Sequence, residues 1–103
     1  MFNLEGHCAL VTGAGQGVGA QIAKVLAEHG ATVLVNDLFH ERADVVVEEI
    51  RNAGGKAAAL IADITKLELL TEQIKRVTVE LGCEVDILVN NAGIPAEGIE
   101  LAR

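Results

Sequence analysis

Four glycines within residues 12–19 constrain this chain more than any other feature of its sequence. An apolar run at 8–11 precedes them, and residues 18–29 have apolar side chains at helical spacing. Glycine costs conformational entropy inside helices and strands, so four of them indicate a tight strand-to-helix turn that another group approaches closely. The amino end of a helix presents unpaired N–H groups and partial positive charge, which favour a phosphate. The segment therefore predicts a phosphate-binding turn.

The spacing of these glycines fits two dinucleotide-binding patterns. Gly15, Gly17 and Ala20 satisfy G-x-G-x-x-G/A, and Gly13, Gly17 and Gly19 satisfy T-G-x-x-x-G-x-G. Either match alone leaves a purely structural turn as the alternative, because glycine-rich turns are common. The full pattern also needs a preceding strand, a following helix and an acidic residue about 20 positions later. Asp37 lies 18 residues after Gly19, at the end of the apolar run 32–35, so the context favours a dinucleotide site.

Apolar runs and helical spacings alternate along the whole chain. The predicted elements are strand 7–12, helix 18–29, strand 32–37, helix 41–53, strand 57–62, helix 67–81 and strand 85–90. The β-branched run 45–47 leaves a strand as the alternative for the second helix, but charged neighbours favour a helix. Continuous apolar runs are typical of strands buried on both faces, and short connections predict a parallel sheet. We expect an α/β, Rossmann-type doubly wound sheet, here only its first half (βαβαβαβ), with strand order 3-2-1-4.

Each predicted helix has a set of mostly apolar residues at helical spacing and a glycine at or near its end. The sets are Val18, Ile22, Val25, Leu26 and His29, with Gly19 and Ala23 small enough for close packing on the sheet; Ala43, Val46, Val47 and Ile50; and Leu67, Leu70, Ile74, Val77 and Leu81. The third helix also has a predicted capping box, in which the Thr65 hydroxyl accepts a helix N–H and Glu68 reaches back.

Gly13, Asp37, Asp63 and Asn90 each follow a predicted strand, so they meet at one edge of the sheet. Asp37 is expected to accept hydrogen bonds from both hydroxyls of an adenosine ribose. A 2′-phosphate at about 4 Å would be repelled by about 1 kcal/mol in water and about 4 kcal/mol at an effective dielectric of 20. No Lys or Arg occurs within 13–19 or just after Asp37, which predicts NAD rather than NADP. Asp63 either accepts a hydrogen bond from the adenine amino group or is a loop or helix-cap residue.

Composition excludes other classes of function. The net charge of −7 disfavours nucleic-acid binding, and no run of about 18 apolar residues predicts a membrane span. The first residues lack the basic start and apolar block of a signal peptide. Cys8 and Cys83 have no metal-ligand spacing, and we expect free thiols in a reducing cytoplasm. The composition predicts a single small cytoplasmic domain.

Taken together, the segment 12–19, Asp37, the Ala62-Asp63-Ile64 run and the Asn90-Asn91-Ala92-Gly93 run resemble the amino-terminal half of a short-chain dehydrogenase/reductase. The resemblance covers residues 3–95. It implies an NAD(H) site with these contacts: Gly13, Gly17 and Gly19 at the pyrophosphate, with Gln16 and Val18 nearby; Asp37 and Leu38 at the ribose; Asp63 and Ile64 at the adenine; and Asn90, Ala92 and Gly93 beside the fourth strand. Asn91 is expected to stabilise the sheet.

That family transfers a hydride between a nicotinamide cofactor and an alcohol or ketone. Its proton-transfer residues, a Ser and a Tyr-x-x-x-Lys motif assisted by an Asn, would follow the fourth strand, and these 103 residues contain no tyrosine. We therefore expect an NAD-binding half-domain at 1–93 and a tail at 94–103 leading towards an absent catalytic half. The alternative is a stand-alone, non-catalytic nucleotide-binding or interaction module. The apolar segment 87–89, an open sheet edge, predicts self-association.

Overall fold

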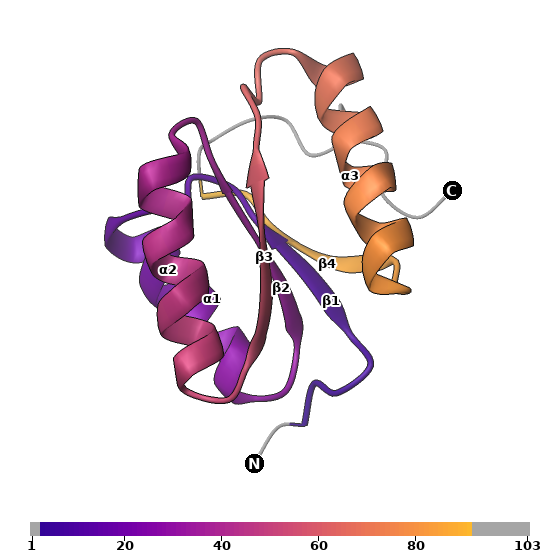
Figure 1. Cartoon of the computed structure of the whole chain (residues 1–103). Helices are drawn as coiled ribbons and strands as arrows, with labels where there is room; N and C mark the ends of the chain where they lie inside the picture. The colour runs from indigo at the N-terminus through magenta and orange to yellow at the C-terminus, as the bar shows by residue number, and fades with distance from the viewer. Residues whose placement is uncertain (1–2, 92–103) are drawn as a thin grey trace.

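The continuous apolar runs form the four strands of a parallel sheet, whose strand order is β3-β2-β1-β4. The computed structural model describes residues 3–91 (Figure 1). Its elements are β1 (Cys8–Val11), α1 (Gly17–Glu28), β2 (Thr32–Asp37), α2 (His40–Asn52), β3 (Lys56–Ile61), α3 (Leu67–Leu81) and β4 (Val85–Val89). The predicted α/β fold and strand order are confirmed, and every predicted element is present with its ends within one residue.

Alternate side chains of β1 and β2 enter two separate cores. Val11, Val33 and Val35 pack with α1 and α2 on one face of the sheet. Leu10 and Leu34 pack with α3 on the other face. Figure 1 shows the same division, with α1 and α2 together on one side and α3 opposite. This layering follows from right-handed crossovers. The strands β2 and β3 are added on one side of β1, whereas β4 is added on its other side, so α3 crosses the opposite face of the sheet.

The buried faces of the helices agree with the sequence pattern in α2 but only partly in α1. All four inward residues predicted for α2 are buried. In α1 the buried residues are Gly19, Ala20, Ala23 and Ala27. Val18 and Val25 of the apolar stripe are 69% and 50% exposed. The small residues face the sheet because they let the helix backbone approach it closely, and Ile22 and Leu26 of the stripe pack, partly buried, against the same core.

The capping box predicted at the start of α3 is wrong. Lys66 is the N-cap residue, and its side chain makes no cap hydrogen bond. The Thr65 hydroxyl instead donates to Asp63 Oδ1 at 2.6 Å, and the Thr65 N–H donates to the same oxygen at 2.9 Å. Aspartate readily forms such local turns with the backbone two residues on, and here that turn replaces the cap. Gly82, with φ of 69°, ends the helix as predicted.

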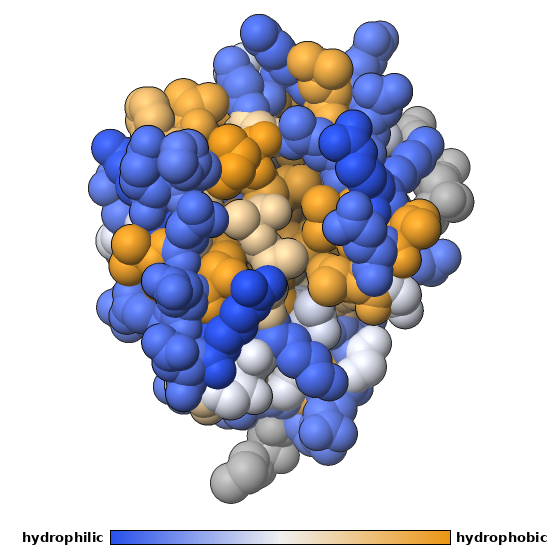
Figure 2. Space-filling view, in the orientation of Figure 1, coloured by the Kyte–Doolittle hydropathy of each residue, from blue (hydrophilic) through white to orange (hydrophobic). Residues whose placement is uncertain are grey.

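The two edge strands are less buried than the two central ones. In β4 only Val85 is buried, and in β3 only Ala57 and Leu60 are buried. Figure 2 shows apolar side chains gathered in a band between the polar outer faces of α2 and α3.

Within residues 3–91, no helix has the length and apolar character needed to cross a membrane. Cys8 and Cys83 are free thiols.

Candidate functional site

The glycine-rich turn connects β1 to α1 at the carboxyl edge of the sheet. Gly13 and Gly17 have φ values of 61° and 59°, in the left-handed region that other residues adopt at a cost. No atom of the described residues lies within 4 Å of the position that a Cβ on Gly17 would occupy. The backbone conformation therefore requires glycine at both positions, and the space over Gly17 is open to a ligand.

Gly15 and Gly19 lie where a side chain has no space. A Cβ on Gly15 would collide with the Asp37 carboxylate and lie 2.7 Å from the Cβ of Arg42. A Cβ on Gly19 would lie 2.5 Å from the carbonyl oxygen of Gly13. Both separations are well below the roughly 3.5–4.0 Å of an ordinary contact between carbon atoms. The turn therefore packs directly against the end of β2.

The amino end of α1 can receive an anion. Gln16, its N-cap residue, makes no side-chain cap hydrogen bond, and the first turn contains no acidic residue. Gln16, Gly17 and Val18 are all exposed. The first N–H groups of a helix have no partner within the helix, so here they face open space with the positive end of the helix dipole. This turn fits a pyrophosphate group.

Asp37 is held at the end of β2 by two backbone amides. The Gly15 N–H donates to Oδ2 at 3.1 Å, and the Phe39 N–H donates to Oδ1 at 3.0 Å. The residue is 6% exposed. A carboxylate has about four acceptor positions, so each oxygen can still accept another hydrogen bond. The two amides thus fix the orientation of the carboxylate and leave acceptor positions on both oxygens, and the neighbouring Leu38 is 55% exposed.

Asn36 is a structural residue of the site that the sequence pattern does not reveal. It is 1% exposed, and its Nδ2 donates to the carbonyl oxygens of Leu60 at 3.0 Å and Ala62 at 3.3 Å. Its Oδ1 accepts the Gly13 N–H at 3.3 Å, and its backbone oxygen accepts the Ala14 N–H at 2.7 Å. Asn36 therefore joins the glycine-rich turn to β3. The available signal was a polar residue directly after the apolar run 32–35, within the same predicted strand.

The end of β4 also supports the turn. The Thr12 N–H donates to the carbonyl oxygen of Val89 at 3.0 Å, and Asn91 Nδ2 donates to that of Gly13 at 3.3 Å. Asn91 thus stabilises the turn rather than facing a ligand, in line with its expected structural role. Asn90 follows the last residue of β4, with its Oδ1 3.5 Å from Thr12 Oγ1. Two further predicted contacts, Ala92 and Gly93, lie outside the described residues.

Asp63 and Ile64 follow β3 on the far side of β2. The Ala62 N–H donates to the carbonyl oxygen of Asp37 at 3.2 Å, so the chain leaves β3 beside Asp37. Hydrogen bonds from the Thr65 hydroxyl and N–H lower the pKa of Asp63 below its ordinary value of 3.8. Asp63 therefore lies in a loop that its hydrogen bonds with Thr65 stabilise, and its contact with adenine stays a prediction. Its Oδ2 accepts no hydrogen bond within residues 3–91. Ile64 packs against the core under α3.

The structure also brings a cation to the site. Arg42 lies in the first turn of α2, and its guanidinium carbon is 4.8 Å from the centroid of the Phe39 ring. The expectation that no cation borders the ribose rested only on residues 13–19 and those directly after Asp37. Helix geometry brings Arg42 back over Gly15, since α2 begins only three residues after Asp37.

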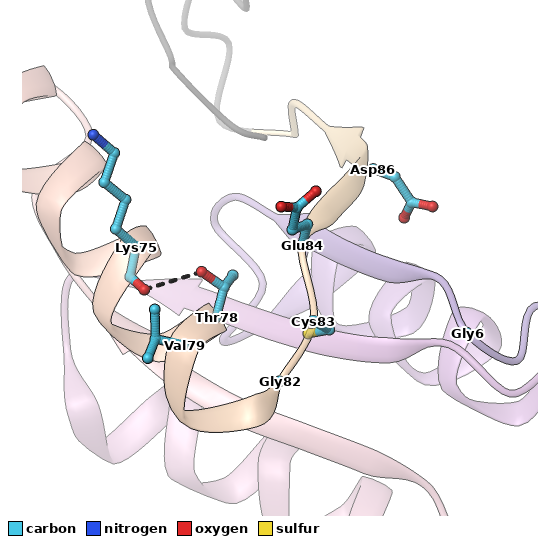
Figure 3. A pocket seen from close by; sticks show the side chains of 8 residues that line it. All are labelled: Gly6, Lys75, Thr78, Val79, Gly82, Cys83, Glu84 and Asp86. Atoms are coloured by element: carbon cyan, nitrogen blue, oxygen red, sulfur yellow. Dashed lines mark hydrogen bonds between the residues drawn. The ribbon is translucent and has the colours of Figure 1, made fainter. Parts of the chain in front are cut away.

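A hollow of about 720 Å³ lies at the opposite, amino edge of the sheet (Figure 3). It is lined by Gly6, Lys75, Thr78, Val79, Gly82, Cys83, Glu84 and Asp86. Asp86 accepts the Cys8 N–H at 2.9 Å and contacts His7 Nδ1 at 2.6 Å. Partial desolvation raises the pKa of Asp86, but these two hydrogen bonds outweigh it and hold the pKa below 3.8. The hollow shares no residue with the glycine-rich turn, so it is separate from the candidate site.

Comparison with known proteins gives matches over nearly the whole chain. The family model described as short chain dehydrogenase matches residues 7–102. The 7α-hydroxysteroid dehydrogenase of Escherichia coli K12 is 46% identical over 98 residues, which cover 90% of this chain and 38% of that protein. The chain thus spans about two fifths of the length of this relative.

Solved structures show the same fold with both nicotinamide dinucleotides. A 7α-hydroxysteroid dehydrogenase complexed with NADH and 7-oxo glycochenodeoxycholic acid has a TM-score of 0.79 and 39% identity, over 93% of this chain and 40% of that one. A metagenomic short-chain oxidoreductase in complex with NADP has a TM-score of 0.80 and 34% identity, over 94% of this chain and 46% of that one.

Proposed function

The chain belongs to the short-chain dehydrogenase family, and from this premise we propose that it binds NAD(H) as part of an oxidoreductase acting on an alcohol or ketone. The observation that carries the proposal is the fixed Asp37 carboxylate beside an open, glycine-built helix terminus. When bound, the cofactor supplies or accepts the hydride. The protein residues described here bind and orient the cofactor.

Each predicted contact has a physical role in this proposal. The turn formed by Gly13, Gly17 and Gly19, with Gln16 and Val18 beside it, holds the pyrophosphate at the amino end of α1. Asp37 accepts hydrogen bonds from the ribose, next to the exposed side chain of Leu38. The remaining contacts are Asp63 and Ile64 at the adenine, and Asn90, Ala92 and Gly93 further along the cofactor.

We further propose that NAD is bound more tightly than NADP. Asp37 is buried, and its charge lies where the 2′-phosphate of NADP would approach. Like charges about 4 Å apart repel by about 1 kcal/mol in water and about 4 kcal/mol at an effective dielectric of 20. That range corresponds to roughly fivefold to a thousandfold in the ratio of dissociation constants.

Calorimetric titration of NAD⁺ and NADP⁺ into the complete protein that contains this sequence tests the proposal. We expect tighter binding of NAD⁺, and a smaller difference in Asp37→Asn, which keeps an acceptor for the Gly15 N–H. Asp44→Asn is the matched control, because it removes an equal charge from an exposed position on α2. NADP⁺ binding equal to or tighter than NAD⁺ binding in the unmodified protein would contradict the preference.

Two further proposals concern the state of the chain. Within residues 3–91, β4 pairs only with β1, so a polypeptide limited to these 103 residues should self-associate through its open edge. Light scattering at tens of micromolar measures this, and a monodisperse monomer would contradict it.

The free thiols Cys8 and Cys83 support a reducing, cytoplasmic location.

A further inference from the structure

Two cysteines that are far apart in the sequence meet in the core beneath α3. Cys8 is the first residue of β1, and its register partner on β4 is Val85. Cys83 lies two residues before Val85, in the connection between α3 and β4. Cys8 and Val85 are buried in the core beneath α3, and Cys83 packs against that same core. The fold therefore brings together the two cysteines of the 103 residues.

Hydrogen bonds of the backbone hold both cysteines in place. The Cys83 N–H donates to the carbonyl oxygen of Thr78 at 3.1 Å, directly after Gly82 ends α3. The Cys8 N–H donates to Asp86 Oδ1 at 2.9 Å, which ties the start of β1 to β4. The Cys8 thiol itself donates a hydrogen bond to the side chain of Cys83. The two side chains are thus already neighbours, as the formation of a disulfide requires.

The two thiols differ in their access to solvent. Cys8 is fully buried, and burial together with the hydrogen bond to Cys83 raises the pKa of the Cys8 thiol to about 12. Cys83 is partly exposed and lines the hollow at the amino edge of the sheet (Figure 3). Next to it, no atom of residues 3–91 lies within 4 Å of the position that a Cβ on Gly82 would occupy. A small molecule in solvent therefore reaches Cys83 first.

We propose that Cys8 and Cys83 form a site of reversible oxidation, at which hydrogen peroxide converts the two thiols into a disulfide. In the first step the Cys83 thiolate attacks one oxygen of the peroxide, so an S–O bond forms and the O–O bond breaks. The departing hydroxide takes up the proton that the Cys83 thiol released. The products of this step are water and a sulfenic acid on Cys83.

In the second step the sulfur of Cys8 attacks the sulfur of Cys83. The S–S bond forms, the S–O bond breaks, and the Cys8 proton leaves with the hydroxide as a second water. The two sulfur atoms together lose two electrons, which the peroxide accepts. Oxidation of Cys83 also removes the repulsion between two thiolates, which is one cause of the raised pKa of Cys8.

This arrangement suits a transient modification in a reducing compartment. Burial protects Cys8 from direct attack by peroxide, and rapid disulfide formation protects Cys83 from further oxidation to a sulfinic acid. A thiol reductant returns both cysteines to thiols, as expected for disulfides that form in the cytosol. The hollow shares no residue with the glycine-rich turn, so the modification does not depend on dinucleotide binding.

The experiment treats the complete protein that contains this sequence with hydrogen peroxide, digests it without reductant and identifies the peptides by mass spectrometry. We expect the peptide of Cys8 joined to that of Cys83, with the loss of two hydrogen atoms, and its separation by dithiothreitol. In Cys8→Ala, Cys83 should stop at the sulfenic acid and be trapped by dimedone. In Cys83→Ser, Cys8 should stay reduced. Thermal melting checks that each variant is folded.

The matched control moves the exposed thiol away from Cys8. Val79 lines the same hollow but is 81% exposed, so Val79→Cys combined with Cys83→Ser offers peroxide an accessible thiol that is not packed on the core. We expect no joined peptide from this variant, and an equal yield would overturn the proposal. Oxidation of Cys83 in the unmodified protein without the joined peptide would overturn it too. So would a joined peptide whose yield falls on dilution, because that link would join two molecules.

Discussion

The absence of a side chain at Gly15 leaves the space that the Asp37 carboxylate occupies. An added methyl group would displace this carboxylate and press on the Cβ of Arg42. Overpacking of this kind typically costs about 1–3 kcal/mol. We therefore expect Gly15→Ala to lower the free energy of unfolding by about that amount. We also expect it to weaken NAD⁺ binding by at least about tenfold, because the group that binds the ribose must move.

Gly54 supplies the matched control. It has φ of 89°, and no atom of residues 3–91 lies within 4 Å of the position that a Cβ would occupy; it lies in the connection between α2 and β3. Gly54→Ala should cost about 1 kcal/mol of stability through backbone strain, and it should leave the NAD⁺ dissociation constant unchanged. Calorimetry and denaturant unfolding measure both quantities. Equal losses of NAD⁺ affinity in the two variants would show that Gly15 acts through general stability only.

The Asp63–Thr65 turn should make stability depend on pH in the acid range. Because the folded-state pKa of Asp63 lies below 3.8, its contribution is present above that pH and is lost as the pH falls through the folded value. Asp63→Asn should therefore lower the Tm most near neutral pH, and the difference from the unmodified protein should shrink below about pH 4. Glu72→Gln, at an exposed position on α3, controls for net charge. A pH-independent difference for Asp63→Asn would contradict this account.

At the scale of single residues, the sequence predicted the groups that carry a recognisable pattern. Asp37 and the glycines were predictable because a strand-to-helix turn and the acidic residue that follows it are recognised by their spacing in the sequence. Asn36 was missed, since a polar residue after the apolar run 32–35 does not show its structural role until its partners on β3 are known. Arg42 was missed because its closeness to Gly15 depends on where α2 begins and how the chain turns before it.

Helix α1 shows how element-scale packing differs from hydrophobic periodicity. Ala23 is fully buried against the sheet, whereas Val25 on the same helix is 50% exposed. Ala23→Leu should destabilise the protein by about 1–3 kcal/mol, because the added carbons would force the helix away from the sheet. Val25→Leu, the control, should change stability by less than about 0.5 kcal/mol. Denaturant unfolding compares the two variants, and an equal effect would indicate that α1 does not pack through its small residues.

Element type and order were predictable because each strand is a continuous apolar run and each helix has a clear period and a glycine near its end. The right-handed crossover rule then left few topologies, so strand order followed from sequence. The start of α3 was not predicted correctly, since Thr65 can serve either a helix cap or the Asp63 carboxylate. Sequence spacing is the same in both cases, and the geometry of the loop decides between them.

At the scale of the whole molecule, the three histidines show which acid groups are near the proposed cofactor site. His7 precedes β1 and His29 follows α1, so both lie at the amino edge of the sheet. His40 begins α2 at the carboxyl edge, where it contacts Glu41 and Asp44. This position is beside Asp37, and therefore at the adenosine end of the proposed site rather than the nicotinamide end.

A polypeptide limited to these 103 residues should therefore bind NADH but reduce ketones no faster than background. Ketone reduction needs an acid that protonates the developing alkoxide, and such groups typically contribute about 10²- to 10⁴-fold. The 103 residues contain no tyrosine, and the one histidine at the carboxyl edge lies away from the expected nicotinamide. The test follows NADH absorbance with a panel of ketones, with Gly17→Trp as the variant that blocks the open space over the turn. Oxidation above background that Gly17→Trp abolishes would contradict the prediction.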